Sequence, residues 1–95
     1  MFVIFLRFAD NKSNAGQFME GHNAWIKKGI EDGIFLVVGS LQPSLGGGIV
    51  AHNITLEDLQ NRVDEDPFVT EKVVAAEIHE ISPSITDERL SFLME

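Results

Sequence analysis

The chain has 95 residues, of which 44% are hydrophobic and 23% are charged, as is typical of one globular domain with a single core. Its 7 Lys and Arg residues are outnumbered by 15 Asp and Glu residues, so the formal net charge is −8. That field disfavours nucleic acid or an anionic membrane as a partner. The absence of cysteine excludes disulfides, thiolate catalysis and zinc–thiolate sites.

The opening run MFVIFL is too short to cross a membrane and has no signal-peptide features, so we expect one cytoplasmic domain over residues 1–95. Residues 1–8 are rich in β-branched and aromatic side chains and predict a strand. Ser13 or Asn14 can cap a helix that runs to about residue 32 and stops at Gly33.

The rest of the chain predicts three more strands and a second helix. Short apolar runs indicate strands at residues 34–38, 49–52 and 73–78. Residues 40–48, which end in a glycine triplet, are expected to form a long hairpin connection. Thr55, with Asp58 three residues later, can cap a helix through about Val63.

This βαββαβ order predicts an α+β, ferredoxin-like fold with a four-stranded antiparallel sheet and both helices on one face. The runs MFVIFL and IFLVV do not alternate apolar with polar residues, so both sheet faces need cover. Only one face has helices to cover it. We therefore expect a homodimer that joins the helix-free sheet faces of two copies.

A histidine interrupts the apolar stripe of the first helix. The stripe consists of residues three and four apart: Ala15, Phe18, Met19, His22, Ile26, Gly29 and Ile30. One interpretation is structural, with His22 partly buried and bonded to a backbone carbonyl. The other is chemical, with His22 facing a cleft and an acidic side chain fixing its tautomer. Gly21 and Gly29 each cost about 1 kcal/mol in a helix, which indicates close approach of another element or a ligand.

The segment Asp66-Pro67-Phe68 is the second marker. Pro67 suits the first position of a short helix, and Asp66 is then its natural N-cap. An N-cap carboxylate can still bind a histidine. We expect an imidazole nitrogen of His22 to lie within hydrogen-bonding reach of Asp66, directly or through one water.

Metal and phosphate sites lack a signature in this chain. His22, His52 and His79 form no His-x-His or His-x-x-x-His pair, so we expect no metal and no cofactor. The glycine triplet precedes a strand rather than a helix, so it does not predict a phosphate-binding loop.

In their order and spacing, several short motifs resemble the YciI-like (YCII-related) family of small α/β proteins. They are the helical His22 followed by Trp25, Asp32-Gly33 before an apolar strand ending at Gly39, Gly46-Gly47-Gly48 before a strand, a Thr55-capped helix, and Asp66-Pro67-Phe68 before the last strand. The resemblance spans nearly the whole chain, with residues 82–95 as a C-terminal extension.

The resemblance implies a dimeric α/β barrel with a cleft that holds a catalytic His22–Asp66 pair. The residues expected to bind substrate in that cleft are Trp25, Gly39, Ser40, Gly47 and Phe68. The family resembles muconolactone isomerases and includes a dehydrochlorinase of a chlorinated aromatic diol. The implied function is acid–base isomerisation or elimination on a small cyclic or aromatic metabolite.

Two other functions fit the same residues. A non-catalytic ligand-binding or accessory protein could use the same cleft, and a haem-handling relative would need His22 or His52 as axial ligand. Residues 85–94 predict a C-terminal helix, capped by Thr86, with apolar residues three and four apart. That helix is expected to dock on the partner subunit or in a higher assembly.

Overall fold

A computed structural model describes residues 1–94. The strands and α-helices are β1 (Phe2–Phe8), α1 (Ala15–Glu31), β2 (Phe35–Leu41), β3 (Gly46–Ala51), α2 (Leu56–Asp64), α3 (Pro67–Thr70) and β4 (Val74–Glu80). Two 3₁₀ segments, Lys12–Asn14 and Glu88–Met94, lie before α1 and after β4.

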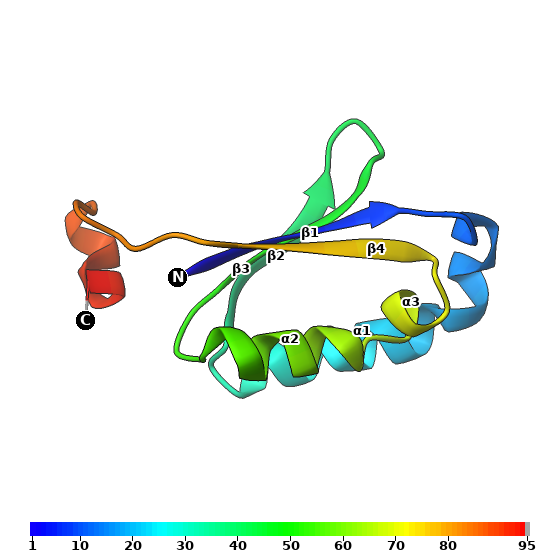
Figure 1. Cartoon of the computed structure of the whole chain (residues 1–95), viewed down its shortest axis with the longest axis horizontal. Coiled ribbons are helices and arrows are strands. Elements are labelled where there is room, and N and C mark those ends of the chain that lie inside the picture. The colour runs from blue at the N-terminus through cyan, green and yellow to red at the C-terminus, as the bar shows by residue number, and fades with distance from the viewer. Residues whose placement is uncertain (95) are drawn as a thin grey trace.

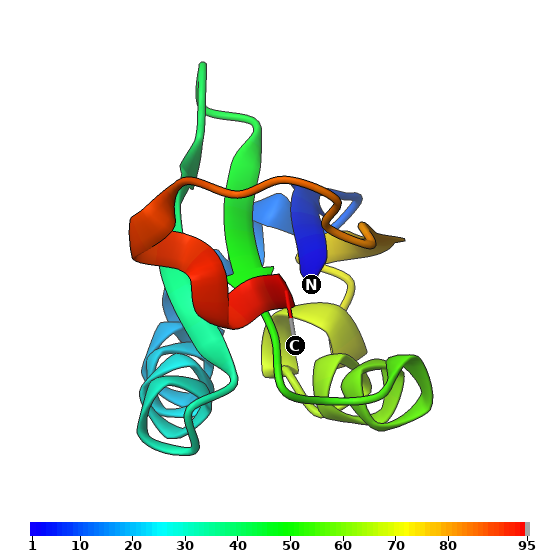
Figure 2. The same cartoon turned by 90° about the vertical axis from the view of Figure 1, so that its left-hand side faces the viewer.

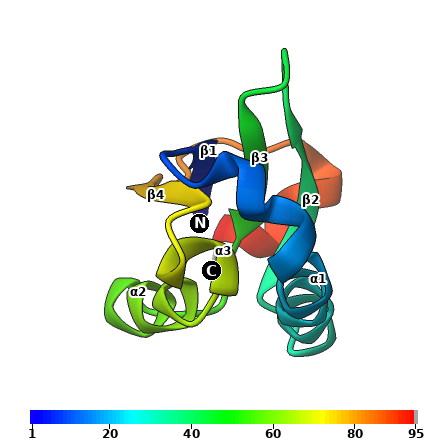
Figure 3. The same ribbon diagram turned by 90° about the vertical axis from the view of Figure 1, so that its right-hand side faces the viewer.

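The four strands form one antiparallel sheet in the order β2-β3-β1-β4. All three α-helices lie on the same face of it (Figure 1). Seen along the strands, α1 lies beneath β2 and β3, α2 lies beneath β4, and the short α3 lies between them (Figure 3). The predicted α+β ferredoxin-like fold is confirmed.

The core lies between the sheet and the helices, and the alternation of β1 shows how it forms. Phe2, Ile4 and Leu6 are buried against the helices, whereas Val3 and Phe5 point to the other face. Leu59 and Val63 of α2 are fully buried on the helix side of the sheet. Full burial of such a side chain contributes about 1.5–3 kcal/mol.

Two glycines of α1 are explained by neighbouring elements rather than by a ligand. A Cβ atom on Gly29 would collide with the ring of Phe35. A Cβ on Gly21 would lie 3.0 Å from Cγ of Pro67, at the start of α3. Both glycines therefore let α1 approach the elements it packs against, which outweighs their low helix propensity.

The β2–β3 connection differs from its prediction. The expected long glycine-rich loop over residues 40–48 is wrong, because β2 continues to Leu41 and β3 already begins at Gly46. The glycine triplet pairs with β1 on one side and with β2 on the other. Gly46 has φ 134°, and a Cβ there would collide with the carbonyl of Leu6, so this central strand needs glycine.

Three predicted helix starts have different outcomes. Thr55 caps α2, because its hydroxyl accepts a hydrogen bond from the Asp58 amide at 3.1 Å. Asn14 precedes α1 without any side-chain cap, since a 3₁₀ turn leads into the helix instead. The C-terminal helix is shorter than expected and is 3₁₀ rather than α, with a kink at Leu90. Its first turn is held by Asp87, which accepts from the Arg89 amide, and not by Thr86.

The C-terminal segment crosses one end of the sheet (Figure 2). The helix-free face beside it is partly apolar: Val37 is 59% exposed, and the ring of Phe5 stands beside His79. Polar groups share this face, because Arg7 donates to Glu77 at 3.3 Å. No helix among residues 1–94 has the length and hydropathy that crossing a bilayer requires.

Candidate active site

His22 lies midway along α1 and makes a polar contact with α3. Its Nδ1 atom is 2.8 Å from Oδ1 of Asp66, and 12% of the His22 side chain is exposed. The contact expected from the sequence is therefore present and direct. A carboxylate, rather than a backbone carbonyl, is the partner of this histidine.

Asp66 is fully buried and serves two neighbours. As N-cap of α3, it accepts a hydrogen bond from the Phe68 amide at 3.0 Å, on the same Oδ1 atom that binds His22. Pro67 follows as the first helical residue, where its missing N–H costs nothing. The second oxygen, Oδ2, is buried without a partner among residues 1–94.

Aromatic rings hold the imidazole plane. The rings of His22 and Phe68 lie parallel, with centroids 3.9 Å apart and planes inclined by 4°. Trp25, one turn further along α1, lies 5.9 Å from His22 at 24°. The hydrogen bond at Nδ1 and the stacking on Phe68 together restrict both tilt and rotation of the imidazole.

A cavity of about 290 Å³ opens beside the imidazole. Its walls come from α1, from the β2–β3 hairpin, from the end of β1 and from Phe68; the lining residues are Leu6, Phe8, Met19, His22, Asn23, Ile26, Val38, Gly39, Ser40, Gly46, Gly47, Gly48, Ile49 and Phe68. The volume is at the lower end of the range for small-molecule sites.

Four of the five residues expected to bind substrate line this cavity: Gly39, Ser40, Gly47 and Phe68. Trp25 does not. Its indole N–H donates to the backbone carbonyl of Arg62 at 2.8 Å, and its ring packs edge-on against Phe35. Trp25 therefore joins α1 to α2 behind His22, outside the cavity wall.

Sequence reasoning missed the contribution of Asn23. The cavity wall on α1 consists of Met19, His22, Asn23 and Ile26, which recur three and four residues apart. The face that packs on the sheet is the neighbouring one, with Phe18, Trp25 and Gly29. Separating these two overlapping stripes would have placed Asn23 beside His22 in the cavity.

The hydrogen bond to Asp66 determines what His22 can do chemically. A carboxylate accepts, so in the neutral imidazole the proton is on Nδ1 and Nε2 carries the free lone pair. Nε2 makes no hydrogen bond to residues 1–94 and is not among the buried unpartnered atoms, so it retains accessible surface. The arrangement can accept a proton from a ligand in the cavity, and Asp66 then faces the imidazolium that forms.

The other two histidines lie elsewhere. His79 is on the helix-free face, with Nε2 3.0 Å from Oε2 of Glu77. His52 lies at the opposite end of the sheet, edge-on to Phe92 of the C-terminal segment. Among residues 1–94, no group of three or more His, Cys, Asp or Glu side chains could hold a metal ion.

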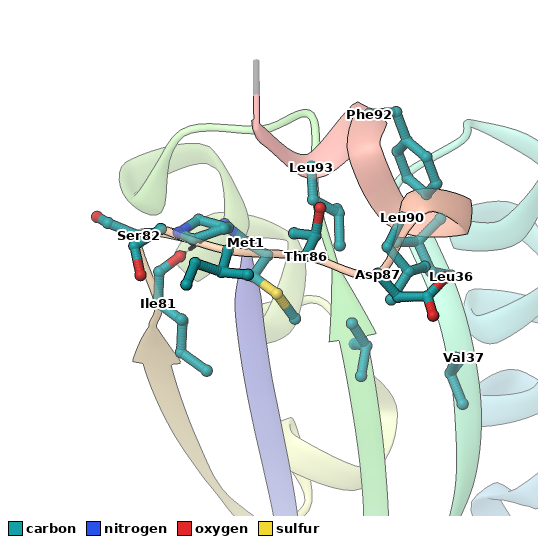
Figure 4. A pocket seen from close by; sticks show the side chains of 14 residues that line it. Met1, Leu36, Val37, Ile81, Ser82, Thr86, Asp87, Leu90, Phe92 and Leu93 are labelled. Atoms are coloured by element: carbon teal, nitrogen blue, oxygen red, sulfur yellow. Dashed lines mark hydrogen bonds between the residues drawn. The ribbon is translucent and has the colours of Figure 1, made fainter.

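A larger hollow of about 740 Å³ lies between the C-terminal segment and the end of the sheet. Leu90, Phe92 and Leu93 of the segment line it together with Leu36 and Val37 of β2, and Leu90 lies near Leu36 (Figure 4). Among residues 1–94, no histidine lines it and Asp87 is the only charged side chain that does. The smaller cavity beside His22 is the better candidate for an active site, because chemistry requires a positioned reactive group.

Comparison with solved structures supports the fold of the chain. The chain is similar in structure to 5-chloro-2-hydroxyhydroquinone dehydrochlorinase (TftG) from Burkholderia phenoliruptrix AC1100, solved in complex with 2,5-dihydroxybenzoquinone. The match has a TM-score of 0.70 and 13% sequence identity and covers 85% of this chain and 93% of the other. At that identity the likeness establishes the shared ferredoxin-like fold. No protein-family model and no curated protein matches the chain.

Proposed function

We propose that the chain is a small acid–base enzyme, of the isomerase or dehydrochlorinase (lyase) type, that acts on a small cyclic or aromatic metabolite. The observation that carries the proposal is the orientation of His22. Its Nδ1 is held by Asp66, which leaves Nε2 for a ligand in the adjoining cavity. The fold shared with a dehydrochlorinase adds support.

In the proposed mechanism, Nε2 of His22 removes a proton from the substrate, from carbon in an isomerisation and from a ring hydroxyl in an elimination. Asp66 does not touch the substrate; it positions the imidazole and stabilises the imidazolium. In an isomerisation, the same proton returns at another carbon. In the elimination from a chlorinated hydroquinone, one ring hydroxyl first shifts its proton to the carbon that carries chlorine. Nε2 then takes the proton of a second hydroxyl, the O–H electrons form a C=O bond, the ring double bond shifts, and chloride leaves with the electrons of the C–Cl bond. One positioned base contributes about 10²–10⁴-fold, which suffices for an activated substrate.

The cavity wall suits a ring-shaped ligand in this proposal. Gly39, Ser40 and Gly47 offer a wall with little side-chain bulk, and Phe68 offers an aromatic edge next to the imidazole. Trp25 has a supporting role, because it contacts His22 from outside the cavity.

The test uses 5-chloro-2-hydroxyhydroquinone and a muconolactone as first substrates, with His22→Gln as the variant. Glutamine keeps an N–H that can donate to Asp66 but supplies no base. We expect turnover by the natural chain and a loss of at least about 10²-fold in His22→Gln. His79→Gln, on the other face of the sheet, is the matched control and should retain full activity. Undiminished turnover in His22→Gln would contradict the proposal.

A non-catalytic ligand-binding or accessory function is the second candidate. One observation favours it: His22 is the only cavity-lining residue among those described that has an ionisable side chain, so no second acid or base assists it. Binding needs a single hydrogen-bonding group, whereas catalysis gains from two. Saturable binding of either substrate without turnover would select this second function.

We also propose that the working form is a homodimer joined by the helix-free sheet faces. The exposed Val37, together with Val3, Phe5 and Val50 on the same face, supports this assembly. The C-terminal segment adjoins that face and is a further place for the partner to dock.

A further inference from the structure

Among residues 1–94, no cationic side chain lies in the wall of the cavity beside His22. None of the lining residues described is Lys or Arg. Arg62 pairs with Asp32 at 3.0 Å and Arg7 pairs with Glu77, both away from the cavity. One lysine is near its rim: the ammonium of Lys12 lies 4.7 Å from the ring centroid of Phe8, which lines the cavity.

The charge of His22 is balanced by its own partner. With a neutral imidazole, the His22–Asp66 pair carries a net charge of about −1, and a protonated imidazole brings the pair to about zero. A bound anion would therefore never meet net positive charge from this pair. An anion that leaves water without a cationic partner pays a desolvation penalty that two neutral hydrogen-bond donors offset only in part.

The polar groups of the wall suit uncharged oxygens. Asn23 on α1 and Ser40 on β2 line the cavity, and both side chains can donate and accept hydrogen bonds. The remaining wall is apolar or glycine, apart from His22. A hydroxyl or carbonyl group on a flat ring can be bonded by either side chain while the ring contacts the apolar wall.

We infer that the site selects an uncharged, flat, oxygen-substituted ring and rejects the same ring carrying a carboxylate, with Asn23 and Ser40 as the specificity-determining residues. The inference rests on the proposed function only in taking this cavity as the ligand site. It concerns binding, so it can be tested without any turnover.

The experiment compares hydroquinone with 2,5-dihydroxybenzoate, which have the same ring and hydroxyl groups and differ by one carboxylate. Each is titrated at neutral pH and low salt into isotope-labelled protein, and NMR shifts of Asn23, Ser40 and the His22 ring are followed. We expect saturable shifts at these residues with hydroquinone and affinity for the carboxylate at least about tenfold weaker.

Asn23→Lys places a cation in the wall and should reverse the preference by raising the affinity for the carboxylate at least about tenfold. Asn61→Lys is the matched control, because it makes the same charge change on α2, away from this cavity, and should leave the preference unchanged. Lys12→Ala tests the rim and should have little effect on either ring.

Three results would overturn the inference: equal or tighter binding of the carboxylate by the natural chain, a carboxylate affinity that depends on Lys12, or no shift at Asn23 and Ser40 with either ring. The failure of this inference can be distinguished from the failure of the proposed function. Selective binding of the neutral ring without turnover keeps this inference and removes the enzyme. Turnover of a carboxylated ring that requires His22 keeps the enzyme and removes this inference.

Discussion

His22 and Asp66 are 44 residues apart in the chain, yet their side chains meet at 2.8 Å. The oxygen that binds His22 also accepts the first amide hydrogen bond of α3. One atom thus joins the middle of α1 to the start of α3, and the orientation of the imidazole depends on a helix cap.

Replacing Asp66 by alanine should be strongly destabilising. The variant loses the cap of α3 and leaves Nδ1 of His22 without its partner, for a combined cost of about 2–4 kcal/mol in the free energy of unfolding. Asp66→Asn keeps an oxygen acceptor and should cost less. Urea unfolding measures both. Asp10→Ala, in the exposed turn after β1, should stay within about 0.5 kcal/mol. Equal stability of Asp66→Ala and Asp10→Ala would show that the hydrogen bonds of Asp66 contribute nothing measurable to the free energy of unfolding.

The glycines of α1 should respond oppositely to alanine. In Gly29→Ala the new methyl collides with Phe35, which should cost about 1–3 kcal/mol despite the better helix propensity. In Gly16→Ala the methyl meets nothing within 4 Å, so the variant should gain about 0.5–1 kcal/mol. Thermal unfolding of the two variants provides the comparison. If both are stabilised, the close packing of α1 on β2 is not present in solution.

A charge on the helix-free face should break the proposed dimer. Val37 faces that side, opposite Val50, so Val37→Asp should halve the mass measured by light scattering and keep a folded far-UV spectrum. Val38 faces the helices and lines the His22 cavity. Val38→Asp should therefore unfold the chain instead. A natural chain that is already monomeric at micromolar concentration would rule out this assembly.

The ion pair between α1 and α2 predicts how stability depends on pH. The Arg62 guanidinium donates to Asp32 and, with Lys28 adding to the effect, holds the pKa of that carboxyl below its usual value. A carboxyl whose pKa is depressed by folding stabilises the protein above its unfolded pKa, and this contribution is lost as pH falls through the folded pKa. Asp32→Asn should thus be less stable than the natural chain at neutral pH. The two unfolding curves should converge in strong acid, and a constant gap at all pH values would contradict the assignment.

The fold could be predicted because it follows from local patterns. Strand runs, the caps at Thr55 and Asp66, and a proline at the first position of a helix act over a few residues, and the structure contains all of them. The cap predicted at Asn14 failed because a preceding 3₁₀ turn supplies the start of α1. For the C-terminal segment, the predicted type of helix was wrong: the segment is a 3₁₀ helix, and Asp87 rather than Thr86 holds its first turn.

The features that the sequence did not predict depend on contacts between segments that are distant in the chain. The glycine triplet is typical of a loop, but it forms a strand here because the Leu6 backbone comes too close to Gly46 for any side chain. Trp25 was expected to line the cleft, but its indole N–H donates to the Arg62 carbonyl, which holds the ring between α1 and α2. The His22–Asp66 contact could be anticipated because each residue was already unusual locally, one as a polar side chain on an apolar stripe and the other as a cap before proline.

Because Oδ1 of Asp66 also caps α3, mutations of His22 and of Asp66 should have different effects on stability. Under the proposed mechanism, a change at His22 would abolish the activity while α3 keeps its cap, so an inactive but folded descendant could arise in one step. A change at Asp66 would remove two hydrogen bonds and lower the stability of the folded chain, so such variants should be more exposed to proteolysis. If the proposed activity is lost during evolution, the loss should therefore begin at position 22 and leave an aspartate at position 66.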